Sequence, residues 1–163
     1  MESSRLDAAI DLETVALTPD AHVLTIGAVI GELDTGRIVD EFYQVVEQHP
    51  TNGHVDIDTM VWWAGQSSQS REAAFGTPGL KLEEVLRYFN DLCAPYGIKG
   101  YWGNGATFDI SILEDKYRKT GLEPPWKFWQ IRDMRTLVDV WGGDKKAVPF
   151  MGTQHHALDD ARH

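Results

Sequence analysis

The stretch that most constrains the fold runs from Arg5 to Glu13 and ends in Asp11-Leu12-Glu13. Alanine and isoleucine precede the two acids, and this pattern favours a β-strand. Side chains alternate across a strand, so Asp11 and Glu13 point to the same face. Two neighbouring carboxylates at the end of an apolar strand are unfavourable unless a cation lies between them. Hard oxygen ligands suit Mg²⁺ or Mn²⁺, so the triplet indicates a metal site or, alternatively, a solvated strand end.

The chain has 163 residues, enough for one domain with its own core, and its 42% apolar content is typical of a globular protein. It has no apolar run of membrane-spanning length and no leader pattern, so we expect a soluble intracellular protein without a membrane partner. The single cysteine, Cys93, lies on an apolar helical stripe and is predicted to belong to the core.

The net charge of −10 argues against binding along a long stretch of phosphates. The charge is unevenly distributed, because residues 1–113 hold six Lys/Arg against seventeen Asp/Glu, whereas residues 114–146 hold eight against six. This basic segment is either a mixed-charge surface or one side of a groove that makes a short contact with nucleic acid. Its members are Lys116, Arg118, Lys119, Lys127, Arg132, Arg135, Lys145 and Lys146.

Two β-rich runs, His22–Leu33 and Arg37–Val46, surround Asp34-Thr35-Gly36 and predict a hairpin. That triplet also occurs in aspartic proteases, but the chain has no second copy to complete a catalytic dyad. A short helix is predicted around Trp62 and Trp63, capped by Asp56 or Asp58. We expect both tryptophans in the core; the alternative is that one faces a cleft and stacks on a base.

The remaining pattern predicts further helices and strands with clear boundaries. We expect helices over Arg71–Phe75, Leu80–Pro95 and Asp109–Thr120, strands over Ile98–Gly103 and Lys127–Arg132, a helix from the cap Asp133 to Val140 or Trp141, and a last helix near His155. The order β-β-β-α-β-α-β-α-α indicates an α/β fold, in which a hairpin-extended mixed sheet has helices on its faces.

Two more acids stand where catalytic chemistry would need them. Asp109 follows a strand and loop at the start of a helix, and taken alone it is a helix cap. Asp160 lies near the start of the last helix, in His155-His156-Ala157-Leu158-Asp159-Asp160. Zinc is disfavoured there, because adjacent histidines diverge on a helix and no further Cys or His has matching spacing.

The ordered pattern D-x-E … N-x₃-F-D … H-x₄-D resembles the DEDDh branch of the DnaQ-like 3′-5′ exonucleases, and the match covers most of the chain. Trp62-Trp63, Trp102-Gly103-Asn104-Gly105 and residues 128–136 look like phage and prophage members of that superfamily. The resemblance implies a ribonuclease-H-like mixed five-stranded sheet, with three antiparallel N-terminal strands and then two parallel ones, flanked by helices. It also implies a single exonuclease domain over residues 1–163.

By this resemblance the protein is a 3′-5′ exonuclease that hydrolyses phosphodiester bonds and releases nucleoside 5′-monophosphates. Its partners are single-stranded DNA or RNA 3′ ends, with DNA favoured, in the cytoplasm of a bacterium or a phage-infected host. The alternatives are an exoribonuclease acting on short RNA and a non-catalytic nucleic-acid-binding module. The sequence leaves the oligomeric state open, with a homodimer as one option.

The resemblance assigns two divalent ions, Mg²⁺ or Mn²⁺, to four carboxylates. Asp11 would bridge both ions, Glu13 and Asp160 would complete the inner site, and Asp109 would support the other ion. Two such ions stabilise charge on the attacking and leaving oxygens. Family spacing selects His155 as the general base, although helical i−4 geometry would select His156. Asp159 could be mistaken for the ligand Asp160 in the same way.

Softer roles follow for residues around this set. Thr14, Asn104, Phe108 and Trp63 are expected to contact the substrate. Asp133 and Thr136 are expected to cap a helix. The chain ends three residues after Asp160, where relatives continue through a full helix, so we expect the final helix to be truncated and the native protein to carry more sequence. A helix that short is marginal unless it is packed.

Overall fold

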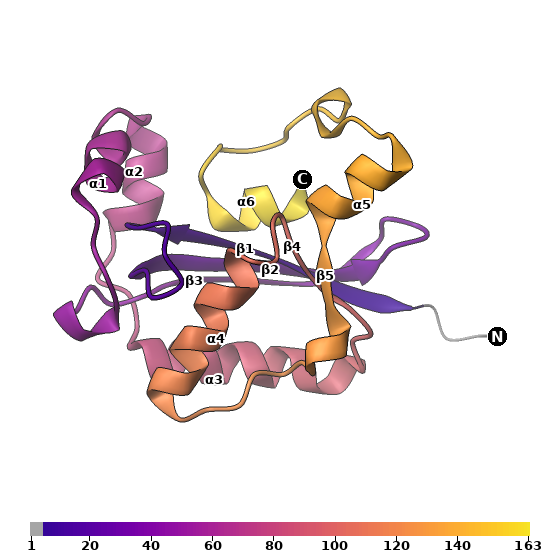
Figure 1. The fold of residues 1–163 in the computed structure, drawn as a ribbon, viewed down its shortest axis with the longest axis horizontal. Helices are drawn as coiled ribbons and strands as arrows, with labels where there is room; N and C mark the ends of the chain where they lie inside the picture. The colour runs from indigo at the N-terminus through magenta and orange to yellow at the C-terminus, as the bar shows by residue number, and fades with distance from the viewer. Residues whose placement is uncertain (1–4) are drawn as a thin grey trace.

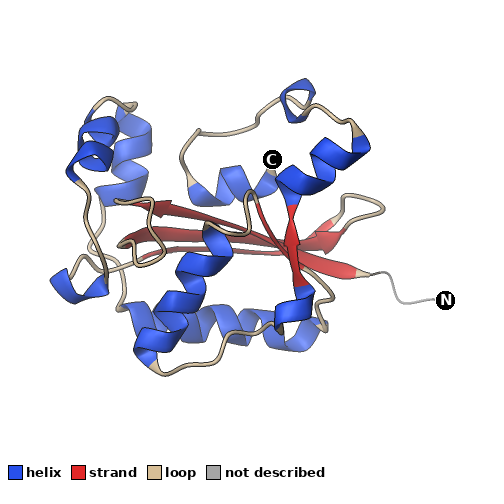
Figure 2. Cartoon of the chain, viewed as in Figure 1, coloured by secondary structure: helices blue, strands red, loops and turns tan. Residues whose placement is uncertain are grey.

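A computed structural model describes residues 5–163, and its centre is one five-stranded mixed sheet with the order β3-β2-β1-β4-β5 (Figure 2). Strands β1 (Leu6–Thr14), β2 (Val23–Glu32) and β3 (Ile38–Val45) are antiparallel neighbours. Strand β4 (Tyr101–Gly103) runs parallel to β1, and β5 (Ile131–Asp133) runs parallel to β4. The predicted ribonuclease-H-like sheet is confirmed.

Among the described residues, six α-helices surround the sheet: α1 (Ile57–Ala64), α2 (Ser68–Phe75), α3 (Leu82–Cys93), α4 (Asp109–Thr120), α5 (Met134–Trp141) and α6 (Ala157–Arg162). Helices α3 and α4 lie on one side of the sheet, α5 and α6 lie on the other, and α1 and α2 sit at one end (Figure 1). Within the described residues, no helix has the length and apolar character needed to cross a membrane.

The central position of β1 follows from its alternating pattern. Ala8, Ile10 and Leu12 point into the core and are at most 4% exposed, where they join apolar side chains of β2, α3 and α4. Strand β1 is hydrogen-bonded on both edges, antiparallel to β2 and parallel to β4. Its backbone is therefore fixed from both sides, and the acids on its opposite face are carried by the most constrained strand of the sheet.

Several element boundaries differ from those expected. The predicted strand Lys127–Arg132 pairs only from Ile131, because Phe128–Gln130 form a 3₁₀ turn. The side chain of Gln130 closes that turn by accepting a hydrogen bond from the Lys127 amide at 2.8 Å. Helix α2 begins three residues earlier than expected because Ser67 caps it. The cap of α1 is Asp56 rather than Asp58.

Other expectations hold. The hairpin turns at Asp34-Thr35-Gly36, with Gly36 in the left-handed region at φ 69°. Cys93 is 3% exposed within the core. Asp133 caps α5, accepting a hydrogen bond from the Thr136 amide at 2.7 Å.

Candidate active site

Strand β1 presents Asp11 and Glu13 on the face that is covered by α6. Glu13 is 8% exposed, whereas Leu12 between them points into the core. Helix α6 packs against both β1 and β2 (Figure 1). The close approach needs Gly27, which lies opposite Asp11 in the register, because a Cβ there would fall 2.2 Å from the carbonyl carbon of Ala157.

Asp109 reaches the same region from the first turn of α4. Its carboxylate accepts a hydrogen bond from the Leu12 amide at 3.2 Å, across 97 residues of sequence. The cap position of α4 belongs to Phe108, so the helix-cap interpretation of Asp109 is wrong. The carboxylate is 3% exposed and instead ties α4 to the strand that carries the other two acids.

The last segment brings Asp160 and His155 to these acids. Ligand atoms of Glu13, His155 and Asp160 all lie within 4.8 Å of one another. His155 stands outside the helix, with φ 59°, and α6 begins only after His156. The helical i−4 argument for His156 therefore does not apply.

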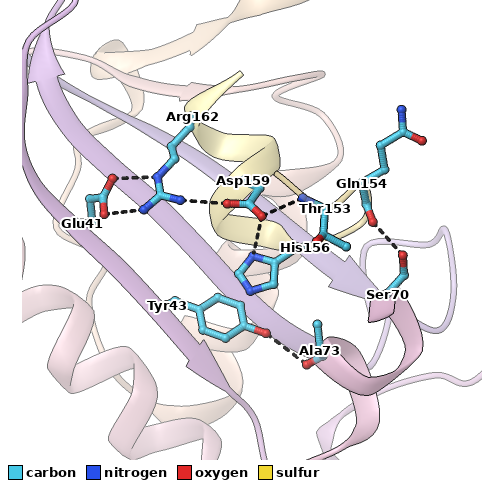
Figure 3. Close-up of polar contacts among 9 residues, drawn as sticks. All are labelled: Glu41, Tyr43, Ser70, Ala73, Thr153, Gln154, His156, Asp159 and Arg162. Atoms are coloured by element: carbon cyan, nitrogen blue, oxygen red, sulfur yellow. Dashed lines mark hydrogen bonds and ion pairs between the residues drawn. The ribbon is translucent and has the colours of Figure 1, made fainter. Parts of the chain in front are cut away.

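The sequence neighbours of His155 and Asp160, which are His156 and Asp159, make other contacts. The His156 ring stacks on Tyr43 of β3, with ring centroids 4.3 Å apart. Asp159 accepts a hydrogen bond from the Thr153 amide and pairs with Arg162 (Figure 3). Asp160, rather than Asp159, is the member of this pair that faces the acids.

Burial raises the pKa of all four carboxyls, and repulsion between neighbouring acids adds to this rise at Asp11 and Glu13. Burial, together with the charges of Asp109, Glu13 and Asp160, raises the pKa of Asp11 well above its ordinary value. Burial and the nearby Asp160 and Asp109 raise the pKa of Glu13 to about 8. Such a cluster is poised to bind cations, since a positive charge would relieve both desolvation and repulsion.

The pKa values of Asp109 and Asp160 are also raised, although nearby groups act to lower them. Burial raises the pKa of Asp109 to about 7, while backbone hydrogen bonds and Arg135 act to lower it. Burial also raises the pKa of Asp160, against the influence of His155 and Lys145. Asp160 Oδ2 is buried and has no hydrogen-bond partner among the described residues. An unpartnered buried carboxylate oxygen is the feature that a bound cation would satisfy.

Two cavities flank the Asp11–Glu13 pair. The larger, about 500 Å³, is lined by Leu12, Glu13, Thr14, Leu17, Asp56, Asp58, Thr59, Trp62 and Phe108. We call it the Glu13 cleft. The smaller, about 250 Å³, lies beside Asp11, Asp160, Asn104 and Lys145. Thr14 and Phe108 therefore share one cavity, whereas Asn104 lies on the other side of the acids.

The two tryptophans differ in burial, contrary to the expectation that both lie in the core. Trp63 is 2% exposed and donates its indole hydrogen to the Thr14 carbonyl at 2.9 Å, so its predicted substrate contact is wrong. Trp62 is 45% exposed and lines the Glu13 cleft, so burial of both rings is also wrong. Its ring meets His155 edge-on at a centroid distance of 4.8 Å. The sequence signal was the roughly 100° step between adjacent helix positions, which left open which ring faced out.

The basic segment does not act as one surface. Lys116 is fully buried and binds Asp115 and the Asp20 carbonyl, so its predicted place on a groove is wrong. Lys145 lines the smaller cavity, where its charge acts to lower the pKa of Asp11 and of Asp160 against the larger effect of burial.

Comparison with known proteins places this geometry among exonucleases. The exodeoxyribonuclease of Enterobacteria phage T4 is 26% identical over 162 residues, covering 82% of this chain and 71% of that protein. The nuclease domain of 3′hExo, a DEDDh family member bound to rAMP, has a TM-score of 0.62 and 17% identity, covering 99% of this chain and 88% of that one.

A zinc-bound E. coli exonuclease I complex with single-stranded DNA has a TM-score of 0.70 and 10% identity, over 98% of this chain and 38% of that one. The fold is thus that of the DEDDh nucleases. The family model described as "3′-5′ exoribonuclease Rv2179c-like domain" matches residues 7–163. The chain therefore belongs to the 3′-5′ exoribonuclease Rv2179c-like family.

Proposed function

We propose that this chain removes nucleotides one at a time from the 3′ end of single-stranded nucleic acid, releasing nucleoside 5′-monophosphates. One observation carries the proposal: Asp11, Glu13, Asp109, Asp160 and His155 converge from β1, α4 and the last segment beside a cleft large enough for a nucleotide. Hydrolysis of a phosphodiester needs anionic ligands for cations and a nearby base, and the site contains both.

The proposed cofactors are two divalent ions, Mg²⁺ or Mn²⁺, held by Asp11, Glu13, Asp109 and Asp160. The donor set fits them, since it consists of hard carboxylate oxygens whose pKa values are raised by burial and, at Asp11 and Glu13, by neighbouring acids. When bound, such ions stabilise the charge that builds on the attacking and leaving oxygens.

The protein residues position the substrate and move the proton. His155 accepts the proton of the attacking water, within reach of Glu13 and Asp160. The exposed ring of Trp62 and the half-buried ring of Phe108 line the Glu13 cleft, where they pack against the terminal base. Thr14 supports this cleft through its carbonyl, which holds Trp63 in place.

RNA is the first candidate substrate, because the family that spans residues 7–163 is described as exoribonuclease. DNA is the second, because the phage T4 relative is described as an exodeoxyribonuclease. This ranking reverses the preference drawn from the sequence alone. The two differ at the sugar 2′-hydroxyl, so matched substrates separate them.

The test uses 5′-labelled single-stranded RNA and DNA of the same sequence, with Mn²⁺, Mg²⁺ or chelator. We expect a descending ladder of products that requires metal. In Asp11→Ala the rate of shortening should fall by a factor on the order of 10²–10³ or more. Faster shortening of RNA would support the first candidate, and faster shortening of DNA the second. A gel shift without shortening under every metal condition would overturn the proposal in favour of a binding module.

The cleft assignment has its own test. Trp62→Ala should raise KM roughly 5- to 150-fold, the loss of one base stack, with a smaller change in kcat. Trp129→Ala is the matched control, since that ring is also exposed but lies outside the cleft. Equal KM values for both variants would contradict the assignment.

A further inference from the structure

Helix α6 carries Asp160 but is poorly equipped to hold itself in place. It has six residues, and Ala157 is its one buried side chain. Helices this short are marginal unless other contacts fix them, so local opening requires little free energy. The position of Asp160, and of His155 just before the helix, therefore depends on contacts made outside the helix.

Arg162, in the last turn, supplies such contacts across 121 residues of sequence (Figure 3). Its Nε and Nη2 donate to the two carboxylate oxygens of Glu41 on β3, at 2.7 and 2.6 Å. Its Nη1 donates to Asp159 at 2.8 Å, one turn earlier on the same helix. A bidentate guanidinium–carboxylate pair fixes orientation as well as distance.

Asp159 links this pair to the segment that holds His155. Its second carboxylate oxygen accepts a hydrogen bond from the Thr153 amide at 2.9 Å and lies 3.8 Å from His156 Nδ1 (Figure 3). His156 stacks on Tyr43, also on β3, with an interplanar angle of 17°. His156 and Arg162, which lie close to His155 and Asp160 in the sequence, thus both contact strand β3.

The energetic consequence is local. The side chains of Arg162 and Glu41 are 39% and 34% exposed, and exposed ion pairs add little to global stability. Hydrogen bonding to Arg162 lowers the pKa of Glu41, so this carboxylate stays ionised throughout the neutral range. Loss of the pair would leave the sheet intact and loosen the C-terminal turn of the helix.

We propose that Arg162, Glu41 and Asp159 form a positioning unit that holds Asp160 and His155 in register with Asp11 and Glu13. The inference rests on the proposed exonuclease function and names residues outside the set expected to touch metal or substrate. The unit acts on the chemical step, because misplacement of reacting groups by about 1 Å lowers rate on the order of 10²-fold.

The first test measures kcat and KM for Arg162→Met and Glu41→Gln, with Arg87→Met as control. Arg87 forms a surface ion pair with Glu83 on α3, with side chains 58% and 53% exposed. We expect each test variant to lower kcat by about tenfold or more and to change KM by less than about threefold. Arg162→Lys should recover only part of the rate, because it loses the bidentate contact. The double variant should be no worse than the poorer single variant, since both remove one interaction.

The second test does not depend on activity. Mn²⁺ should raise the thermal midpoint less in Arg162→Met than in wild type or Arg87→Met, because Asp160 is no longer held among the metal ligands. If Arg162→Met kept its kcat within about twofold and showed the full metal-induced shift, the positioning unit would be refuted. Loss of activity in Asp11→Ala would then still support the exonuclease. If the wild-type protein were inactive, the exonuclease proposal would fail, and the Mn²⁺-induced rise of the thermal midpoint would alone test the positioning unit.

Discussion

The two halves of the site are built by different means. Asp11, Glu13 and Asp109 stand on elements fixed by backbone pairing and by the main core, and a buried hydrogen bond joins Asp109 to Leu12. Asp160 and His155 stand on a short helix and the segment that leads into it, held by a close glycine contact and surface ion pairs. The first half forms with the fold, whereas the second is completed by contacts that a single substitution can remove.

This difference indicates where catalysis is vulnerable. Substitutions that disturb the β1 half should also affect folding, because they lie at the centre of the sheet. Substitutions around α6 should separate activity from stability, because few buried side chains depend on them.

The largest effect within the α6 half should come from its base. His155→Ala should lower kcat about 10²- to 10⁴-fold at saturating metal, the usual range for a positioned acid–base group. His156→Ala should have an effect at least about tenfold smaller, because that ring packs on Tyr43 and does not join the group of Glu13, His155 and Asp160. Steady-state kinetics on one labelled oligonucleotide decide between them. A larger loss for the His156 variant would reverse the assignment.

An intermediate effect is expected where α6 rests on the sheet. In Gly27→Ala the new methyl group would lie 2.2 Å from the Ala157 backbone, so α6 must move away from β2. We expect kcat to fall by about tenfold or more and stability by about 1–3 kcal/mol, a typical overpacking effect. Chemical denaturation gives the second quantity.

Gly65→Ala is the control for this substitution, because a methyl group there meets its nearest neighbour at 3.4 Å, in ordinary contact. If Gly27→Ala retained full activity, the close seating of α6 would not matter for the site.

The smallest effect concerns the pH dependence of the metal-free protein. The pKa values of Asp109 and Glu13 are raised to about 7 and about 8, so the folded state binds more protons than the unfolded state over much of the range below pH 8. Stability should therefore fall as pH rises. In chelator, we expect the thermal midpoint to drop by roughly 5 °C between pH 6.5 and 8.5.

The pH range of this experiment starts at 6.5 because burial lowers the pKa of His22. At lower pH that histidine makes stability rise with pH, opposite to the effect of the acids. Mn²⁺ should raise the midpoint more at pH 8.5 than at pH 6.5, since bound cations favour the ionised acids. Asp11→Asn should flatten the slope by removing one of the repelling charges. A midpoint that rose with pH in chelator would show that these carboxyls are not destabilising.

Sequence reasoning was most successful where periodicity and capping act locally. The hairpin, the Asp133 cap and the bounds of α4 follow from neighbouring residues. It was wrong at residues 127–130, where one glutamine side chain turns the chain before the strand begins. It was also wrong about Trp63 and Lys116, because burial of a ring or a cation depends on elements distant in sequence.

By itself, the sequence determined the mixed sheet, the helix order and the pairing of Asp11 with Glu13, since a period-two strand and its caps are local properties. The tertiary structure decided that Asp109 reaches Leu12, that Trp62 faces the cleft and that Arg162 anchors α6 to Glu41. Those contacts join residues about 50 to 121 positions apart. Only packing of the whole sheet and its helices brings such residues together, because no local pattern encodes which distant surfaces meet.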